Sequence, residues 1–196
     1  MNETINMEGH LTLQLTDLAA RLVHEQRRHN LIVKSGRDLV AKLFAGVAGG
    51  APPTRVTHMA VGTNATLAID SQTALLGERP SRKEILPADV VYTEYAEPVT
   101  GGGPVAGTSG PADTTRVGGA VGGPIPIVAP ALPVVRRVRV TLKTVFDFNE
   151  ANGTDPLREA GIFNAATGGV MYNRVVFDPV SKTNAFKLTL IWDITF

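Results

Sequence analysis

The sequence predicts a mainly β protein, an antiparallel β-sandwich or flattened barrel with one short α-helix and a long Gly/Pro-rich extended loop. Short segments in which apolar and polar residues alternate recur along the chain, and turn residues separate them, as in half-buried antiparallel strands. A single segment has the apolar spacing of an amphipathic helix. Because helices do not alternate with the strands, the pattern favours packed antiparallel layers over a βαβ arrangement.

The first half of the chain contains four expected strands. Residues 10–16 alternate strictly, so that Leu11, Leu13 and Leu15 share one face and polar residues share the other. Residues 21–34 have a mixed apolar and basic pattern, and the β-branched residues near their end favour one strand over a helix. The remaining two strands are expected at residues 56–61 and 90–95, and a long polar loop is expected between them at residues 66–78.

One short amphipathic helix is expected at residues 36–45. Ser35 can accept a hydrogen bond from the backbone N–H near Asp38, which resembles a capping box, and Asp38 suits the first turn of a helix. Gly46 can end the helix in the left-handed conformation. Four apolar residues are expected on one helical face: Leu39, Val40, Leu43 and Phe44.

The composition changes sharply at residues 99–133, where glycine pairs and triplets alternate with prolines and no aromatic residue occurs. Such a segment cannot bury enough side chain to offset the cost of ordering its backbone, about 1 to 2 kcal/mol per residue. We therefore expect an extended arm that is ordered by contact with neighbouring subunits. Its apolar strip supplies four candidate interface residues: Ile125, Ile127, Val128 and Leu132.

The second half of the chain returns to strand patterns. From Val138 to Phe148 alternate residues are apolar, which predicts a strand over this range. Gly168 and Gly169 suit a hairpin with a return strand at residues 170–177. A last strand at residues 188–196 places Trp192 in the core. We expect residues 1–98 and 134–196 to form one β-domain, which residues 99–133 interrupt.

Charge and composition restrict the function classes. The net charge of +1 does not provide the broad positive field of non-specific nucleic-acid binding, so no nucleic-acid partner is expected. Cysteine is absent, which excludes disulfides, thiolate nucleophiles and Cys-based zinc sites and suits folding in a reducing cytoplasm. Residues 1–9 lack the apolar core of a signal peptide, and no stretch has the length of a membrane span, so no membrane partner is expected.

No arrangement of catalytic or metal-binding residues is visible. The four histidines do not have metal-ligand spacing, and no serine lies in a Gly-x-Ser-x-Gly elbow. The glycines at 101–107 lack the Gly-Lys-Ser/Thr ending of a phosphate loop. Five carboxylates near turns have no calcium-loop spacing and are interpreted as turn formers: Asp147, Glu150, Asp155, Glu159 and Asp178. We expect no enzymatic activity, no cofactor and no metal.

The densest basic group surrounds the strand after the arm. Arg137, Arg139 and Lys143 share one strand face and, with Arg136 beside them, are candidate interface residues. A solvated face or contact with an acidic subunit is favoured over nucleic acid, because no aromatic residue lies between the charges.

Several phrases, in their order along the chain, resemble small β-rich virion proteins of tailed bacteriophages and phage-derived particles, of the tail, baseplate and collar-fibre type. The phrases are HNLIVKSGR at 29–37, THMAVGT at 57–63, TALLGE at 73–78, REAGIF at 158–163, and the closing residues 182–196. The arm at 99–133 departs from the pattern. The resemblance implies a homo-oligomer or symmetric assembly with other virion proteins as partners, located in the virion after synthesis in the host cytoplasm, and no catalytic residues.

The expected function is therefore a structural subunit of the tail, baseplate or neck, with fibre attachment as one role. A capsid decoration protein is the nearest alternative, since extended loops also serve on capsid surfaces. A carbohydrate- or ligand-binding β-sandwich is the alternative from another class, with an uncharacterised hydrolase after it.

Overall fold

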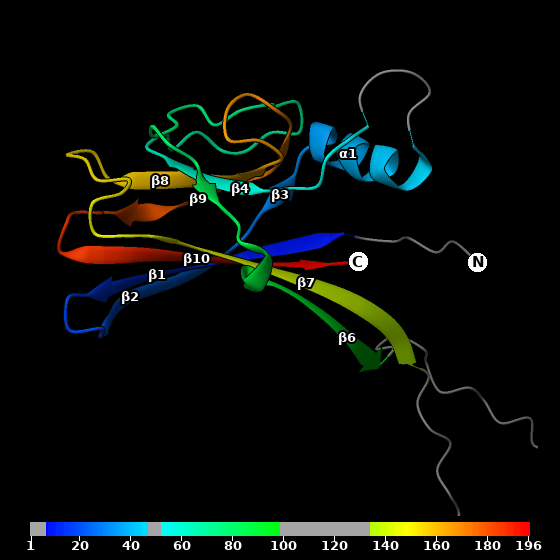
Figure 1. The fold of residues 1–196 in the computed structure, drawn as a ribbon, viewed down its shortest axis with the longest axis horizontal. Helices are drawn as coiled ribbons and strands as arrows, with labels where there is room; N and C mark the ends of the chain where they lie inside the picture. Colours follow the sequence, from blue (N-terminus) through cyan, green and yellow to red (C-terminus); the bar gives the residue numbers. More distant parts are fainter. Residues whose placement is uncertain (1–6, 47–51, 99–133) are drawn as a thin grey trace, which may run out of the picture. The chain divides into compact units, whose positions relative to one another are not determined.

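The computed structural model describes residues 7–46, 52–98 and 134–196, which form two five-stranded antiparallel sheets and one α-helix (Figure 1). The prediction of a mainly β, antiparallel fold with a single helix is confirmed for these residues. The arm at 99–133 lies outside them. The chain divides into a first unit, residues 1–93 and 138–196, and a second unit, residues 94–137, of which the strand ends at 94–98 and 134–137 are described.

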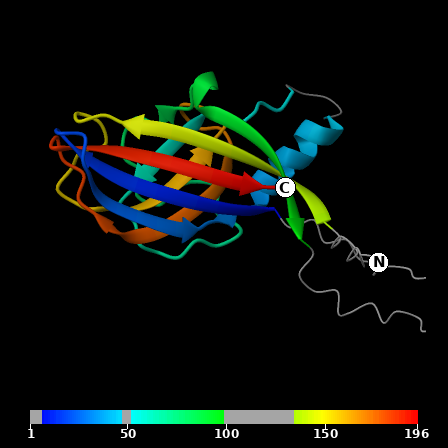
Figure 2. The ribbon, with the colours of Figure 1, turned by 90° about the horizontal axis from the view of Figure 1, so that it is seen from below.

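The first sheet has the strand order β2-β1-β10-β7-β6. Figure 2 shows β7 in yellow, β10 in red and β1 and β2 in blue lying side by side in this order. At its centre β1 and β10 pair along their whole length, with Leu11 opposite Trp192. The bounds are β1 Glu8–Asp17, β2 Leu22–His29, β6 Val90–Pro98, β7 Val134–Phe146 and β10 Phe186–Thr195.

The second sheet has the order β3-β9-β8-β4-β5, and most residues of β8 and β9 are buried. One face of these strands packs on the core between the sheets. The loop between β4 and β5 lies over the other face, as Figure 1 shows. The bounds are β3 Leu31–Ile32, β4 His58–Gly62, β5 Lys83–Glu84, β8 Leu157–Phe163 and β9 Met171–Val180.

Apolar side chains from both sheets form one core, as expected of a sandwich. Leu11, Leu13 and Leu15 are buried on the inner face of β1, as the alternation predicts. Trp192 is fully buried, so its predicted core position is confirmed. Its indole N–H donates a hydrogen bond to the Oδ1 of Asn30 at 2.9 Å, which satisfies the one polar group of a large buried side chain.

The prediction of a single strand at residues 21–34 is wrong, because the chain passes from one sheet to the other at Asn30. β2 belongs to the first sheet and β3 to the second. Asn30 is buried between them, its backbone N–H donates to the carbonyl of Gly9, and its side chain contacts Trp192. A Cβ at position 9 would collide with the Asn30 side chain, so this crossing requires glycine there.

The helix α1, Lys34–Ala45, begins two residues before the predicted start. Ser35 is not its cap, since Val33 precedes the helix and the Ser35 hydroxyl instead donates to the carbonyl of Met171 at 2.8 Å. Gly46 follows with the positive φ expected of glycine, +74°, but with an extended ψ of 179°.

The four apolar residues expected on one helical face differ in burial. Leu39 is buried, whereas Phe44 is 94% exposed. Phe44 lies five positions after Leu39, which is about 140° of rotation around an α-helix. Only part of the predicted face can therefore pack on the sandwich.

Two strand ends also differ from the prediction. β7 ends at Phe146 rather than Phe148, because the backbone N–H of Glu150 bonds the carbonyl of Asp147 and closes a turn. β10 ends at Thr195, although the N–H of Phe196 still donates to the carbonyl of Val138 at 2.8 Å. The expected glycine hairpin between β8 and β9 is confirmed, with φ of +59° at Gly168 and +70° at Gly169.

Candidate functional site

The predicted basic face falls on β7. Arg137, in the second unit, forms an ion pair with Glu97, with 3.1 Å between Nε and Oε2. Arg139 and Lys143, in the first unit, have the opposite strand parity to the buried Leu142, and Lys143 is exposed. The charge of Arg137 is thus already compensated within the chain. The other candidate interface residues, in the arm, lie outside the described residues.

A fully buried ion pair between Glu159 of β8 and Arg174 of β9 was not predicted from the sequence. The interpretation of Glu159 as a turn former is wrong, because this residue lies within a strand. Nε of Arg174 lies 2.8 Å from Oε2 of Glu159, and neither side chain is exposed to solvent. The sequence contains a signal for it, because both charged residues interrupt strands that are otherwise largely apolar. Charged residues are almost never fully buried unless they are paired.

The pair anchors the loop at residues 63–82, called here the anchored loop. Glu159 accepts hydrogen bonds from the backbone N–H groups of Gly77 at 2.6 Å and Leu76 at 3.2 Å, and a longer one from Asn64 at 3.4 Å. Arg174 donates from Nη1 to the Oε1 of Gln72 at 3.0 Å. Both ends and the middle of the loop are therefore tied to one buried pair.

The anchored loop presents apolar side chains to solvent. Leu67 is 77% exposed, Ile69 56% and Leu76 51%. An ion pair between Arg37 of α1 and Asp70 adds a further tie at 2.8 Å and lowers the pKa of the Asp70 carboxyl. Exposed apolar side chains on a fixed support are typical of protein-binding surfaces, because little conformational freedom is lost on binding.

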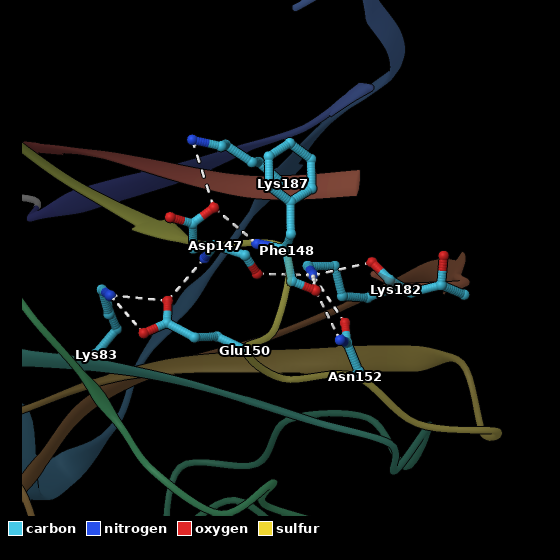
Figure 3. Close-up of polar contacts among 8 residues, drawn as sticks. Lys83, Asp147, Phe148, Glu150, Asn152, Lys182 and Lys187 are labelled. Atoms are coloured by element: carbon cyan, nitrogen blue, oxygen red, sulfur yellow. Dashed lines mark hydrogen bonds and ion pairs between the residues drawn. The ribbon is translucent and has the colours of Figure 1, made fainter. Parts of the chain in front are cut away.

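A second polar cluster, drawn in Figure 3, joins the loop after β7 to the loop before β10. Its centre is Lys182, which is 1% exposed. The Lys182 ammonium donates to the carbonyl of Asp147 at 3.0 Å, the Oδ1 of Asn152 at 2.8 Å and the carbonyl of Thr183 at 3.1 Å. The carbonyl of Phe148 lies at 3.4 Å.

Burial lowers the pKa of Lys182, because removal from water disfavours the ammonium form, although the carboxylates of Asp147 and Glu150 oppose this shift. Four oxygens surround its three N–H bonds. The arrangement therefore crosslinks two loops.

The carboxylates beside Lys182 act as turn formers, as the sequence predicts. Glu150 accepts from the backbone N–H of Asp147 at 2.7 Å and binds the ammonium of Lys83 with both oxygens at 2.7 Å (Figure 3). Asp147 accepts from the N–H of Phe148, and this bond lowers the pKa of its carboxyl. Within the described ranges, no three His, Asp or Glu side chains are close enough together to hold a metal ion.

None of residues 90–97 of the edge strand β6 is buried. It ends the sheet order, so its outer edge has no strand neighbour in the described part of the chain. Val91 is 52% and Tyr92 63% exposed in the first unit. In the second unit, Val134 and Val135 of β7 are 56% and 46% exposed.

An apolar groove of about 150 Å³ lies in the first unit between α1 and the inner residues of β7 and β10. Leu43, Val140 and Phe196 are among its lining residues, and Arg55 is the charged member of the described lining. Tyr172 also lines it. The Tyr172 hydroxyl is buried without a hydrogen-bond partner among the described residues, and burial raises its pKa.

The described helix is too short and too polar to cross a membrane. Comparison of the chain with protein-family models, curated proteins and solved structures found no match.

Proposed function

We propose that this chain is a structural subunit of the tail, baseplate or neck of a tailed bacteriophage or phage-derived particle, acting through subunit–subunit binding. The resemblance of five sequence phrases to such virion proteins motivates the proposal. The observation that supports it best is the edge strand β6, which ends the order of the first sheet and has Val91 and Tyr92 exposed near its start.

A bare sheet edge presents a row of N–H and C=O groups that can pair with another chain. Monomeric proteins usually protect such an edge with charged side chains, proline or a cover. β6 begins with the exposed apolar residues Val91 and Tyr92, and its charged residues, Glu94 and Glu97, come later in the strand. Tyrosine is enriched in protein interfaces because it buries a large area at low entropic cost. The first part of the edge, at Val91 and Tyr92, therefore suits binding to another chain.

The location is tested on purified particles from the producing strain. Mass spectrometry of the particles and electron microscopy with antibody against this chain are expected to detect it at the tail, baseplate or neck. Label over the head would replace the proposal with the capsid-decoration alternative. A chain absent from the particles would refute a virion role.

The role of β6 as a binding surface is tested by introducing a charged residue at its exposed edge. Tyr92→Lys is expected to reduce incorporation into particles by at least about tenfold, which corresponds to roughly 1.4 kcal/mol of binding free energy. Leu86→Lys is the matched control, because Leu86 is 53% exposed but lies outside the strands. Equal incorporation of both variants and the unchanged chain would show that β6 is not an interface.

A further inference from the structure

We propose that His10 of β1 and His29 of β2 bind a divalent transition-metal ion, such as Zn²⁺, on the outer face of the first sheet. The inference goes beyond the proposed function and does not depend on it, because it names a metal ligand rather than a neighbouring subunit. It starts from the strand pairing, which brings together two histidines that are well separated in the sequence.

The two histidines are direct neighbours across the β1–β2 ladder. The register pairs His10 with His29, and in the adjacent pair the backbone N–H of Asn30 donates to the carbonyl of Gly9 at 3.0 Å. Hydrogen-bonded and non-hydrogen-bonded pairs alternate in an antiparallel ladder, so His10 and His29 form a non-hydrogen-bonded pair. Side chains lie closest together in such pairs. The backbone therefore holds both imidazole rings side by side on one face of the sheet.

The distance between the rings suits a shared metal ion. Their centroids lie 4.9 Å apart, and the ring planes form an angle of 83°. Zinc binds an imidazole nitrogen at about 2.1 Å, so two rings that bind one ion at an angle of about 90 to 110° have centroids roughly 4.6 to 5.3 Å apart. The observed separation falls within this range. A histidine ring turns readily about its last side-chain torsion, so one nitrogen of each ring can face a common point without movement of the strands.

The pair is accessible to an ion from solution and lies among favourable charges. His10 is half-buried and His29 is exposed. The carboxylates of Glu8 and Asp193 influence His10 electrostatically, as does the guanidinium of Arg27, so negative groups outnumber positive ones around it. Asp193 of β10 is also the register partner of His10 on its other side. A carboxylate beside a metal-binding histidine commonly orients the ring and raises its basicity.

The ligand type determines the class of ion. Imidazole nitrogen suits zinc, copper and nickel, whereas magnesium and calcium prefer oxygen ligands. Two histidines supply only part of a tetrahedral coordination shell, and water completes it. The ion therefore remains open to a further ligand, in contrast to a closed structural zinc site with four protein ligands.

The proposal is tested by isothermal titration of the full-length chain, without a histidine tag, with Zn²⁺. We expect one ion to bind per chain, and His10→Ala and His29→Ala each to weaken binding by at least about tenfold. His24→Ala is the matched control, because His24 lies on the same strand as His29 but pairs with the buried Leu15 and so belongs to the opposite face. His58→Ala, on β4 of the second sheet, is a second control. Both controls are expected to bind Zn²⁺ as the unchanged chain does.

Nuclear magnetic resonance of the imidazole rings provides a second readout, which identifies the ligands directly. Zn²⁺ is expected to shift the ring signals of His10 and His29 and to leave those of His24 and His58 in place. Mg²⁺ at the same concentration is expected to shift none of them, since it prefers oxygen ligands.

Three results would overturn the proposal: no binding of Zn²⁺ by the unchanged chain, undiminished binding by the His10→Ala and His29→Ala chains, or equal weakening by His24→Ala. Circular dichroism of each variant confirms that a loss of binding does not arise from unfolding. The two proposals fail separately. A chain that binds Zn²⁺ at these histidines but is absent from particles refutes only the virion role, and a chain that is present in particles but binds no Zn²⁺ refutes only the metal site.

Discussion

Glu159 and Arg174 form an ion pair, 2.8 Å between Nε and Oε2, that is completely shielded from water. The same carboxylate holds the backbone N–H groups of Leu76 and Gly77. The pair thus connects the interior of the second sheet to the loop that exposes Leu67 and Ile69. Removal of either charge should affect both stability and loop position.

Arg174→Met is expected to lower the free energy of unfolding by about 3 to 5 kcal/mol, because it leaves an uncompensated buried carboxylate. Urea denaturation followed by tryptophan fluorescence measures the change. Arg28→Met is the matched control, since Arg28 pairs with the largely exposed Asp178 and should cost about 1 kcal/mol or less.

Simultaneous replacement of Glu159 and Arg174 tests whether the anchored loop depends on the Glu159 carboxylate. In many proteins an apolar pair substitutes for a buried ion pair without loss of stability. Glu159→Leu with Arg174→Met should remain destabilised here, because loop N–H groups lose their acceptor, at about 1 to 3 kcal/mol for each buried group left unpaired. Wild-type stability of the double variant would mean that the loop does not depend on Glu159.

Lys182→Met is expected to destabilise the fold by about 1 to 3 kcal/mol, because the carbonyls around the ammonium lose their common donor. Hydrogen exchange should then increase at residues 147–152 and 181–185. Lys187→Met serves as control, since Lys187 is 41% exposed and its pair with Asp147, at 3.4 Å, should contribute about 1 kcal/mol or less. Similar effects of both substitutions would argue against Lys182 as a crosslink.

Trp192→Ala is expected to cost about 3 to 5 kcal/mol, as other large-to-small core substitutions do. Trp192→Phe keeps most of the ring volume but leaves the Oδ1 of Asn30 without its donor, so it should cost about 1 to 3 kcal/mol. Chemical denaturation monitored by circular dichroism measures both. A change below about 1 kcal/mol for Trp192→Ala would place this side chain outside the core.

Asp17 gives a pH-dependent prediction. The backbone N–H of Arg21 donates to its carboxylate at 2.9 Å, the Arg21 side chain also binds it, and these bonds lower the pKa of Asp17. The folded pKa is below the unfolded one, so this stabilisation is complete above about pH 3.9 and is lost as the pH falls through the folded pKa.

Asp17→Asn should therefore be less stable than wild type above about pH 4, and the difference in the free energy of unfolding should become smaller as the pH falls below about 4. Thermal unfolding of both chains across the acid range measures this difference. A constant difference down to the lowest pH would show that the charge of Asp17 does not contribute.

The sequence predicted what depends on local periodicity. Alternation placed Leu11 and Leu13 correctly because one face of β1 packs on the core and the other does not. It placed Trp192 for the same reason. It failed at Asn30, because alternation shows which residues face inward but not which of two sheets receives them. The partner that fixes Asn30 is Trp192, more than 160 residues away in the chain.

The candidate sites depended still more on distant contacts. Glu159 and Arg174 are visible as charges within apolar strands, but their pairing follows from a register between β8 and β9 that contains irregularities. The burial of Lys182 follows from two loops that meet only in the folded chain. Arg137, by contrast, was recognisable as a basic residue. Its partner Glu97 precedes it by 40 residues in the sequence, so the ion pair could not be predicted from the spacing of charged residues.

The pairing of β1 with β10 has a consequence for biosynthesis. The partners in this ladder are as much as 187 residues apart, from Glu8 to Thr195, and such non-local pairing makes folding slow. A ribosome adds roughly 5 to 20 residues per second, so β1 is synthesised roughly 10 to 40 seconds before the strand that completes its sheet. During that interval Leu11, Leu13 and Leu15 lack their final cover. Yield in a recombinant host should therefore respond to chaperone capacity and growth temperature more than to the stability of the finished fold.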